Sequence, residues 1–377
     1  MSAALEVSGL TLAIGGVAVV DDVSFSVAPG EVMALVGESG CGKSITALAL
    51  MRLLPRAVRL AGGRIMLGAE DIATLPERRM RALRGRGISM IFQEPQAALD
   101  PLAPIGAQIG EAACLPRAVC QTAGRILLGA EDIATLPERR MRALRGRRIS
   151  MIFQEPQAAL DPLAPIGAQI REASGLPRAA ARAAVRRMIA EVGIADPDRR
   201  IDQYPFELSG GMSQRVMIAS ALIGEPSVLV ADEPTTALDV TIQAQILDLL
   251  RRLAAERGTA IVLITHDMGV VADIADRVGV MYAGRIAEIG PTAAVFARPR
   301  HPYTARLLAA IPRLADAPKS RLAVIEGSVP APAQYGAGCR FAGRCPHADA
   351  RCSAEPPPLR ETGGGHLAAC WHSERLA

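Results

Sequence analysis

A glycine-rich segment near the N-terminus constrains the fold of this chain more than any other feature. Residues Gly37–Ser44 read GESGCGKS and lie between an apolar run, Val32–Val36, and a stretch from Lys43 to Leu54 with apolar residues at helical spacing. The segment matches the pattern G-x-x-x-x-G-K-S, which joins a strand to a helix through a glycine turn. Backbone N–H groups in such a turn surround phosphate oxygens at the helix N-terminus. We therefore expect a phosphate-binding strand–loop–helix unit.

Polar residues in two segments predict how the phosphates of a nucleotide would be bound and hydrolysed. Lys43 is expected to reach the β- and γ-phosphates of a nucleotide, and Ser44 to bind Mg²⁺. Further along, the apolar run Val228–Ala231 precedes Asp232 and Glu233. A carboxylate at the end of a buried strand, here Asp232, holds Mg²⁺ through water, and Glu233 is placed to polarise the attacking water. The expected nucleotide-binding residues of the loop are Gly37, Glu38, Ser39, Gly40, Cys41, Gly42, Lys43 and Ser44.

Composition excludes several other classes of protein. The chain has 377 residues, 42 basic and 38 acidic, with a net charge of +4 and no long basic run, so a dedicated nucleic-acid-binding protein is not expected. Its apolar stretches are far shorter than the roughly 20 residues that span a bilayer. The N-terminal sequence MSAALEVSGL carries no secretory signal pattern, and we expect the chain in the cytoplasm. Buried strands alternate with helical segments, which predicts a parallel α/β sheet.

A tandem repeat interrupts this alternation. Residues 63–118 recur almost unchanged as residues 124–179. Two nearly identical copies with nothing similar around them do not make a solenoid, which needs about three or more repeats. Each copy predicts a short strand, an Arg-rich helix and a second strand, ISMIFQ. The glutamines of these copies are Gln93 and Gln154, and only one of them can lie beside Mg²⁺.

Four further motifs resemble those of one family. The string LSGGMSQR at Leu208–Arg215 resembles the signature of ATP-binding-cassette proteins and precedes the acidic strand end, as in that family. Residues 237–239 are similar to its D-loop, ending in Asp239, and His266 is similar to its switch histidine. The string IFQEP resembles its Q-loop. This resemblance covers residues 1–290.

The resemblance implies a fold and a set of roles. The implied fold class is α/β: a P-loop NTPase with a RecA-like core, an antiparallel β subdomain and a helical subdomain at about residues 156–224. The implied catalytic residues are Glu233, His266 and Gln154, with Gln93 as the alternative for contacting Mg²⁺. Two cassettes of this family form a head-to-tail dimer. Ser209 and Gly211 would then contact the γ-phosphate held by the partner, and together with Gly210 they open a helix whose N-terminus suits an anion.

A second resemblance narrows the function. Residues 281–313 are similar to the segment that follows the cassette in ATPases of dipeptide, oligopeptide and nickel importers, and they contain RHPYT at Arg300–Thr304. The resemblance implies an ATP-hydrolysing subunit at the cytoplasmic face of the inner membrane. Its implied partners are separate permease chains, a second ATPase subunit and, indirectly, an extracytoplasmic solute-binding protein.

The alternative function is that of a degenerate subunit that binds ATP with little hydrolysis. A cassette acting on nucleic acid or ribosomes commonly carries two complete cassettes, which this chain lacks.

The last part of the chain, residues 291–377, is rich in proline and glycine and predicts a separate extension. Its four cysteines follow the spacing C-x5-C-x6-C-x17-C and are Cys339, Cys345, Cys352 and Cys370. Four thiolates in a reducing compartment suit an iron–sulfur cluster or zinc. Some peptide-importer ATPases carry a four-iron four-sulfur cluster here, and the spacing resembles theirs. Zinc stays open, because three histidines could replace thiolates as ligands: His347, His366 and His372.

Overall fold

The computed structural model divides the chain into two compact units. Unit 1 comprises residues 1–68 and 260–377, and unit 2 comprises residues 69–259. The structure describes residues 3–55, 57–84, 87–91, 127–128, 131–132, 164–174, 178–203, 207–235, 240–311 and 323–376. No helix within these ranges has both the length and the apolar character that crossing a bilayer requires.

Unit 1 contains an antiparallel sheet of β2 (Val17–Val27), β1 (Leu5–Ile14) and β4 (Val58–Leu67), in that order. The alternation of VSFSV in β2 places Phe25 inside, where it is 5% exposed. This sheet corresponds to the expected antiparallel β subdomain.

The second sheet of unit 1 carries the phosphate-binding loop. Parallel strands β10 (Ala260–Ile264) and β11 (Arg277–Tyr282) flank β3 (Val32–Val36) on its two sides. β12 (Arg285–Pro291) then pairs antiparallel with β11. Every residue of β3 and β10 is buried, as expected for continuous apolar runs in a parallel sheet.

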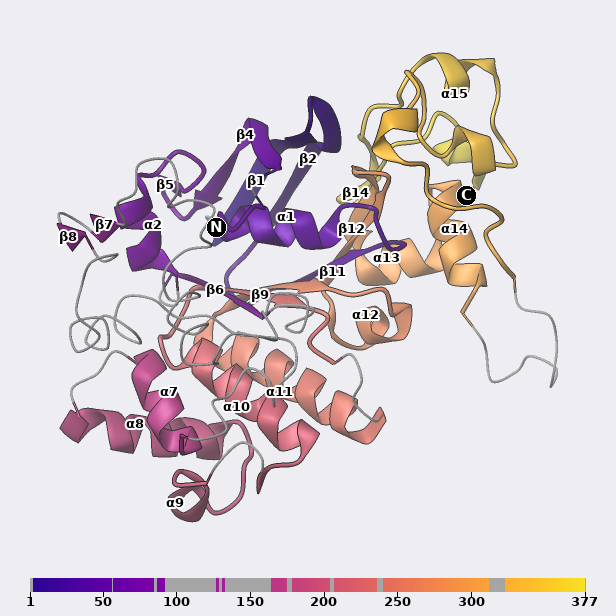
Figure 1. The fold of residues 1–377 in the computed structure, drawn as a ribbon. Helices are drawn as coiled ribbons and strands as arrows, with labels where there is room; N and C mark the ends of the chain where they lie inside the picture. Colours follow the sequence, from indigo (N-terminus) through magenta and orange to yellow (C-terminus); the bar gives the residue numbers. More distant parts are fainter. Residues whose placement is uncertain are drawn as a thin grey trace. The chain divides into compact units, whose positions relative to one another are not determined.

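Helices and short 3-10 turns complete unit 1 (Figure 1). They are α1 (Lys43–Leu50), α12 (Met268–Ile274), α13 (Thr292–Ala297), α14 (Pro302–Ala309), η3 (Pro332–Gln334), η4 (Ala342–Arg344), α15 (Ala350–Ala354) and η5 (Ser373–Leu376). Helix α1 ends before the expected Leu54, with its C-cap at Met51.

The extension adds strands to the sheet of β3, β10, β11 and β12, which the sequence did not predict. β14 (His366–Ala368) pairs antiparallel with β12, and β13 (Arg360–Gly363) pairs with β14. Phe341 of the extension is 1% exposed and belongs to the same hydrophobic core as Val36. The boundary near residue 290 stays a prediction, but residues on its two sides share one sheet and one core.

Unit 2 holds a parallel strand pair and a group of helices. β6 (Ile88–Ile91) lies parallel to β9 (Val228–Asp232). Helices α7 (Ile166–Ser174), α8 (Arg178–Glu191) and α10 (Gly210–Leu222) pack on one another, as expected of a helical subdomain. The remaining elements are β5 (Glu70–Asp71), α2 (Glu77–Leu83), β7 (Leu127–Leu128), β8 (Glu131–Asp132), α9 (Pro197–Arg200) and α11 (Val240–Arg257).

Both repeat copies contribute to unit 2. β6 and α2 come from the first copy, whereas α7 comes from the second. From the second copy the described residues also include β7, in the expected first strand, and β8, where a polar turn was expected; each has two residues. The described elements of unit 2 therefore come from both copies of the repeat.

Candidate nucleotide site and cysteine cluster

The phosphate-binding loop follows β3 and needs glycine at its first position. Gly37 has φ +150°, and a Cβ there would lie 2.2 Å from the Met281 carbonyl oxygen. Gly42 has φ +102° and is the N-cap of α1, in the left-handed region that favours glycine. The sequence thus folds as the expected strand–loop–helix unit.

Lys43 is the first residue of α1, and its ammonium group lies inside the loop. Its Nζ donates to the carbonyl oxygens of Gly37, at 2.7 Å, and Glu38, at 3.0 Å. Only 7% of the residue is exposed. Ser44 follows it in the first turn of the eight-residue helix. A cation together with the backbone N–H groups of a helix N-terminus forms an anion site of the kind that binds phosphate.

The acidic strand end lies in unit 2. Asp232 is the last residue of β9 and is 2% exposed. Glu233 follows with φ +50°, a left-handed conformation that is uncommon for a non-glycine residue and stores strain. Gln214 of α10 donates from Nε2 to the carbonyl oxygen of Pro234 at 2.7 Å. This buried hydrogen bond fixes the turn that carries Glu233.

The signature string opens α10. Ser209 is the N-cap, and its Oγ accepts from the Met212 N–H at 3.4 Å. A Cβ on Gly211 would lie 2.7 Å from Ile242, so a larger residue would separate α10 from α11. With Gly210, these residues form a second helix N-terminus suited to an anion.

The other expected residues are placed as follows. His266 is exposed two residues after the end of β10, and Asp267 caps α12 by accepting the Gly269 N–H at 2.8 Å. Three residues lie outside the described part of the chain: Gln93, Gln154 and Asp239.

The four expected cysteines of the extension gather around one small cavity, although they are up to 31 positions apart. Burial raises the pKa of each thiol, that of Cys370 to about 11, so the thiols are protonated at neutral pH. The thiols lining this cavity are those of Cys339, Cys345, Cys352 and Cys370.

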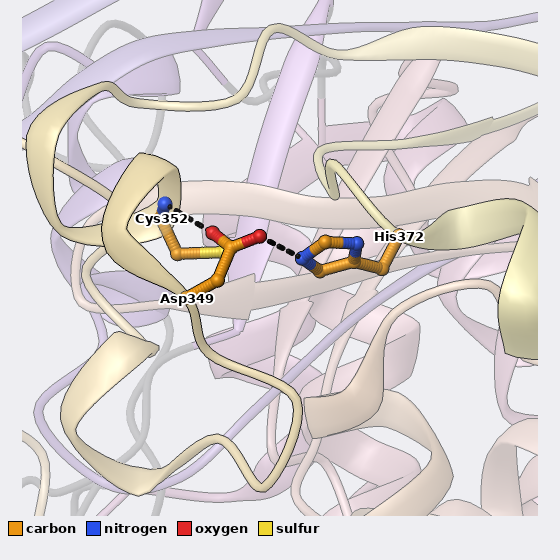
Figure 2. Close-up of side chains that lie close together, drawn as sticks. All are labelled: Asp349, Cys352 and His372. Carbon is orange, nitrogen blue, oxygen red and sulfur yellow. Dashed lines mark hydrogen bonds and ion pairs between the residues drawn. The ribbon is translucent and has the colours of Figure 1, made fainter.

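A carboxylate and an imidazole lie beside one of these thiols (Figure 2). Asp349 accepts the N–H of Cys352 at 2.9 Å, and its other oxygen lies 3.0 Å from Nε2 of His372. These three residues are a group whose potential ligand atoms all lie within 4.8 Å of one another. His372 was an expected alternative ligand, but Asp349 was not.

Three residues with direct contacts to the site were missed by sequence reasoning: Gln214, Tyr303 and Arg344. Gln214 lies inside the signature string and Tyr303 inside RHPYT. The sequence therefore marked both positions, but it did not predict which residues they contact. Arg344 and Tyr303 both contact Glu38 of the phosphate-binding loop. The one local signal for Arg344 is that it directly precedes Cys345.

Two family descriptions match the chain. Residues 20–104 and 112–236 match the family described as ABC transporter. Residues 287–352 match the one described as oligopeptide/dipeptide transporter, C-terminal region.

Curated relatives align along nearly the whole chain. A probable peptide ABC transporter ATP-binding protein, y4tR, of Sinorhizobium fredii is 42% identical over 368 residues, which cover 97% of this chain and 91% of the relative. The dipeptide transport ATP-binding protein DppD of Bacillus subtilis is 40% identical over 364 residues, which cover 96% and 91%.

Solved structures share the fold at lower identity. The cbiO1 protein of Clostridium perfringens, part of an ABC transporter complex, is 23% identical with a TM-score of 0.56 and covers 79% of this chain and 92% of its own. The bacterial ABC transporter cassette MJ0796, whose structure is dimeric, is 19% identical with a TM-score of 0.52 and covers 76% and 98%.

Proposed function

The chain belongs to the ABC transporter family of ATP-binding cassettes, and from this membership we propose that it is the ATP-hydrolysing subunit of a peptide importer. The proposal depends most on the combination of a phosphate-binding loop and an importer-type C-terminal region in unit 1. The Gly37–Ser44 loop opens α1. The region that matches oligopeptide/dipeptide transporters packs into the same hydrophobic core as Val36 of β3, the strand that precedes this loop. The relatives named above are peptide or dipeptide transport proteins, which supports peptides over nickel.

The residues of the site divide the work of hydrolysis. Lys43 and the loop N–H groups bind the β- and γ-phosphates, while Ser44 and Asp232 hold Mg²⁺. Glu233 orients the attacking water, and His266 contacts the γ-phosphate. We keep Gln154 as the Mg²⁺-contacting glutamine and Gln93 as its alternative. β6 precedes Gln93 and favours it, whereas continuity with α7 favours Gln154.

The proposed partners follow from the cassette's mechanism. A second ATPase subunit, related head to tail, presents Ser209, Gly210 and Gly211 to the nucleotide, with Asp239 nearby in the D-loop. Permease chains receive the conformational change at the cytoplasmic face of the inner membrane, and a solute-binding protein delivers the peptide outside. Glu233 and His266 are both present, which weighs against a degenerate subunit without hydrolysis.

Replacing the proposed catalytic carboxylate tests this function. Glu233→Gln should leave ATP binding intact and lower turnover by orders of magnitude, because it removes a positioned catalytic group. Lys43→Ala should instead weaken ATP binding itself. ATP hydrolysis is measured on the full-length chain with and without its permease. Equal turnover in the wild type and Glu233→Gln would refute the assignment.

We further propose that the four cysteines hold a four-iron four-sulfur cluster. A tetrahedral zinc ion, at about 2.3 Å from each sulfur, would bring all four sulfurs within about 4 Å of one another. Among the described residues, the potential ligand atoms of Asp349, Cys352 and His372 lie within 4.8 Å of one another, and the four sulfurs form no group as close as that. Four cysteines that line one cavity fit an iron–sulfur cluster, which would take all four as ligands.

The protonation state of the four cysteine thiols affects how a cluster would be bound. The raised thiol pKa values mean that binding must release protons, so loading is favoured by higher pH. A bound cluster would supply one-electron redox chemistry and cross-link the extension.

The metal content decides between cluster and zinc. Anaerobically purified protein should be brown, with iron and labile sulfide near four per chain. Cys345→Ser should remove the colour. Stoichiometric zinc without iron would decide for the alternative.

A further inference from the structure

We propose that Arg344 and Tyr303 of the extension are positioning residues for the phosphate-binding loop and act on it through Glu38. They lie 306 and 265 positions along the chain from Glu38. The inference rests on the proposed role of the loop in binding ATP. It makes ATP affinity depend on a region outside the recognised cassette motifs.

The guanidinium group of Arg344 binds the Glu38 carboxylate. Its Nη1 lies 3.0 Å and 3.2 Å from the two carboxylate oxygens and 3.3 Å from the Tyr282 hydroxyl. The Arg344 side chain is 10% exposed and that of Glu38 is 26% exposed. A charge-assisted contact this shielded from water is stronger than a surface ion pair.

Arg344 is itself fixed in place by the extension. Its Nε donates to the carbonyl oxygen of Glu326 at 2.8 Å, and its Nη2 donates to those of Ile325 and Gly327 at 3.1 and 3.2 Å. All three guanidinium nitrogens are therefore engaged. A donor held this rigidly imposes its position on Glu38.

Tyr303 holds the backbone of the same residue. The Glu38 N–H donates to the Tyr303 hydroxyl oxygen at 2.9 Å. Tyr303 is fully buried, and its ring packs against those of Tyr282 and Phe341 at centroid distances of 4.7 and 5.4 Å. Burial raises the pKa of Tyr303, so the phenol stays neutral and its oxygen remains an acceptor.

The position of Glu38 matters because its main chain contacts the phosphate-binding lysine. The carbonyl oxygens of Gly37 and Glu38 are the acceptors for Lys43 Nζ. A loop that is fixed before ATP arrives loses less conformational freedom on binding. Holding Glu38 therefore preorganises the loop around Lys43.

Charge compensation is a second way in which the Arg344–Glu38 ion pair should favour ATP binding. Glu38 is a carboxylate within a loop that must accept a triphosphate, so its negative charge opposes binding unless it is compensated. Arg344 supplies the compensating charge. Removing Arg344 should therefore do more damage while Glu38 is charged than when it is neutral.

The test measures the dissociation constant of MgATP by titration calorimetry on the full-length, anaerobically purified chain. Arg344→Gln should weaken binding about tenfold, and Arg344→Lys, which keeps the charge, by less. The double variant Glu38→Gln/Arg344→Gln should recover the part of the affinity that the uncompensated carboxylate costs, while the part due to loop positioning stays lost. The loss should appear in the KM for ATP and not in kcat, because both residues act on the loop that binds the phosphates and not on the proposed catalytic carboxylate.

Arg351→Gln is the matched control. Arg351 precedes Cys352 as Arg344 precedes Cys345, but it stacks over Trp371 at 3.5 Å and is paired with Glu355 at 3.8 Å. Its substitution should leave the MgATP dissociation constant and the iron content unchanged. A loss in Arg351→Gln equal to that in Arg344→Gln would assign the effect to general damage and overturn the proposal.

Other outcomes also decide the matter. Wild-type affinity in Arg344→Gln, or no recovery in the double variant, would overturn the inference. If Arg344→Gln does not fold, Tyr303→Phe removes only the hydroxyl and should weaken binding about threefold. Wild-type affinity in Tyr303→Phe would then overturn it. A wild-type chain that binds no MgATP would instead refute the proposed function.

Discussion

A single buried carboxylate shows how the extension is attached to the cassette. Glu288 of β12 is fully buried and accepts the N–H groups of Arg300, at 2.6 Å, and His301, at 3.0 Å. Its Oε1 also lies 2.6 Å from Nε2 of His366 in β14. A buried charge is tolerated when hydrogen-bond donors surround it. Glu288 therefore makes attachment of β14 dependent on a polar network as well as on backbone pairing.

His301, beside this network, predicts how stability depends on pH. Burial lowers its pKa from 6.5 to about 4, although Glu288 acts in the opposite direction. Between about pH 4 and 6.5, His301 is therefore protonated in the unfolded chain and neutral in the folded chain. The stability from the neutral ring is complete above about pH 6.5 and is lost as the pH falls towards 4, by up to about 3 kcal/mol. Urea unfolding from pH 4 to 7 should show this loss.

His301→Asn separates this effect from other titrations. Asparagine keeps a side-chain oxygen that can cap α14, as His301 Nδ1 does for the Tyr303 N–H, but it does not titrate. This part of the pH dependence should disappear in His301→Asn and persist in His347→Asn, which changes an exposed histidine. An unchanged profile in His301→Asn would contradict the assignment.

Among the elements, α10 links the signature string to the turn that carries Glu233, the proposed catalytic carboxylate. Gln214→Leu would leave the buried Pro234 carbonyl without its donor, at a cost of about 1–3 kcal/mol. The strained turn at Glu233 should then relax. We expect kcat to fall by about tenfold while the MgATP dissociation constant stays near that of the wild type. Steady-state ATPase assays and calorimetry on the same preparation measure both quantities.

The neighbouring residue on α10 provides the control. Ser213 is fully buried, and its Oγ has no hydrogen-bond partner among the described residues. Ser213→Ala removes an unsatisfied hydroxyl, so it should keep kcat and leave stability equal or slightly raised. A similar loss of kcat in Ser213→Ala would show that helix packing, and not the Gln214 hydrogen bond, sets the rate.

Elements were predictable from sequence where their signal is local. The Gly37–Ser44 loop, the buried β3 and the helix that begins at Lys43 follow from spacing and glycine alone. β13 and β14 were not predictable, because each is short and lies in a proline- and glycine-rich region without alternation. The Arg344–Glu38 pair was likewise invisible, since no local pattern encodes a partner 306 positions away.

For the whole molecule, the repeat offers two routes through nearly identical sequence. Deleting residues 63–123 leaves one copy, joining Gly62 to Gly124. Loop closure does not oppose the longer chain strongly, since a tenfold longer loop adds only about 2 kcal/mol. A spare ISMIF segment is a ready template for aggregation. We therefore expect the deletion to raise soluble yield and to retain or raise ATP hydrolysis.

Point variants identify the glutamine in use. In the full-length chain, alanine at only one of Gln93 and Gln154 should lower ATP hydrolysis, and we expect Gln154 to be that residue. Dependence on Gln93 alone, with Gln154→Ala fully active, would show that the path uses the first copy. Loss of all activity on deletion would contradict the view that one copy suffices.

The span between Glu38 and Arg344 also sets an order of events during synthesis. The ribosome adds about 5–20 residues per second, so the loop emerges many seconds before the arginine that holds it. Until Arg344 has been synthesised, the loop lacks the ion pair that holds Glu38 in position. A message truncated before Arg344 would yield chains that bind ATP weakly, and such chains would waste little nucleotide while they await degradation.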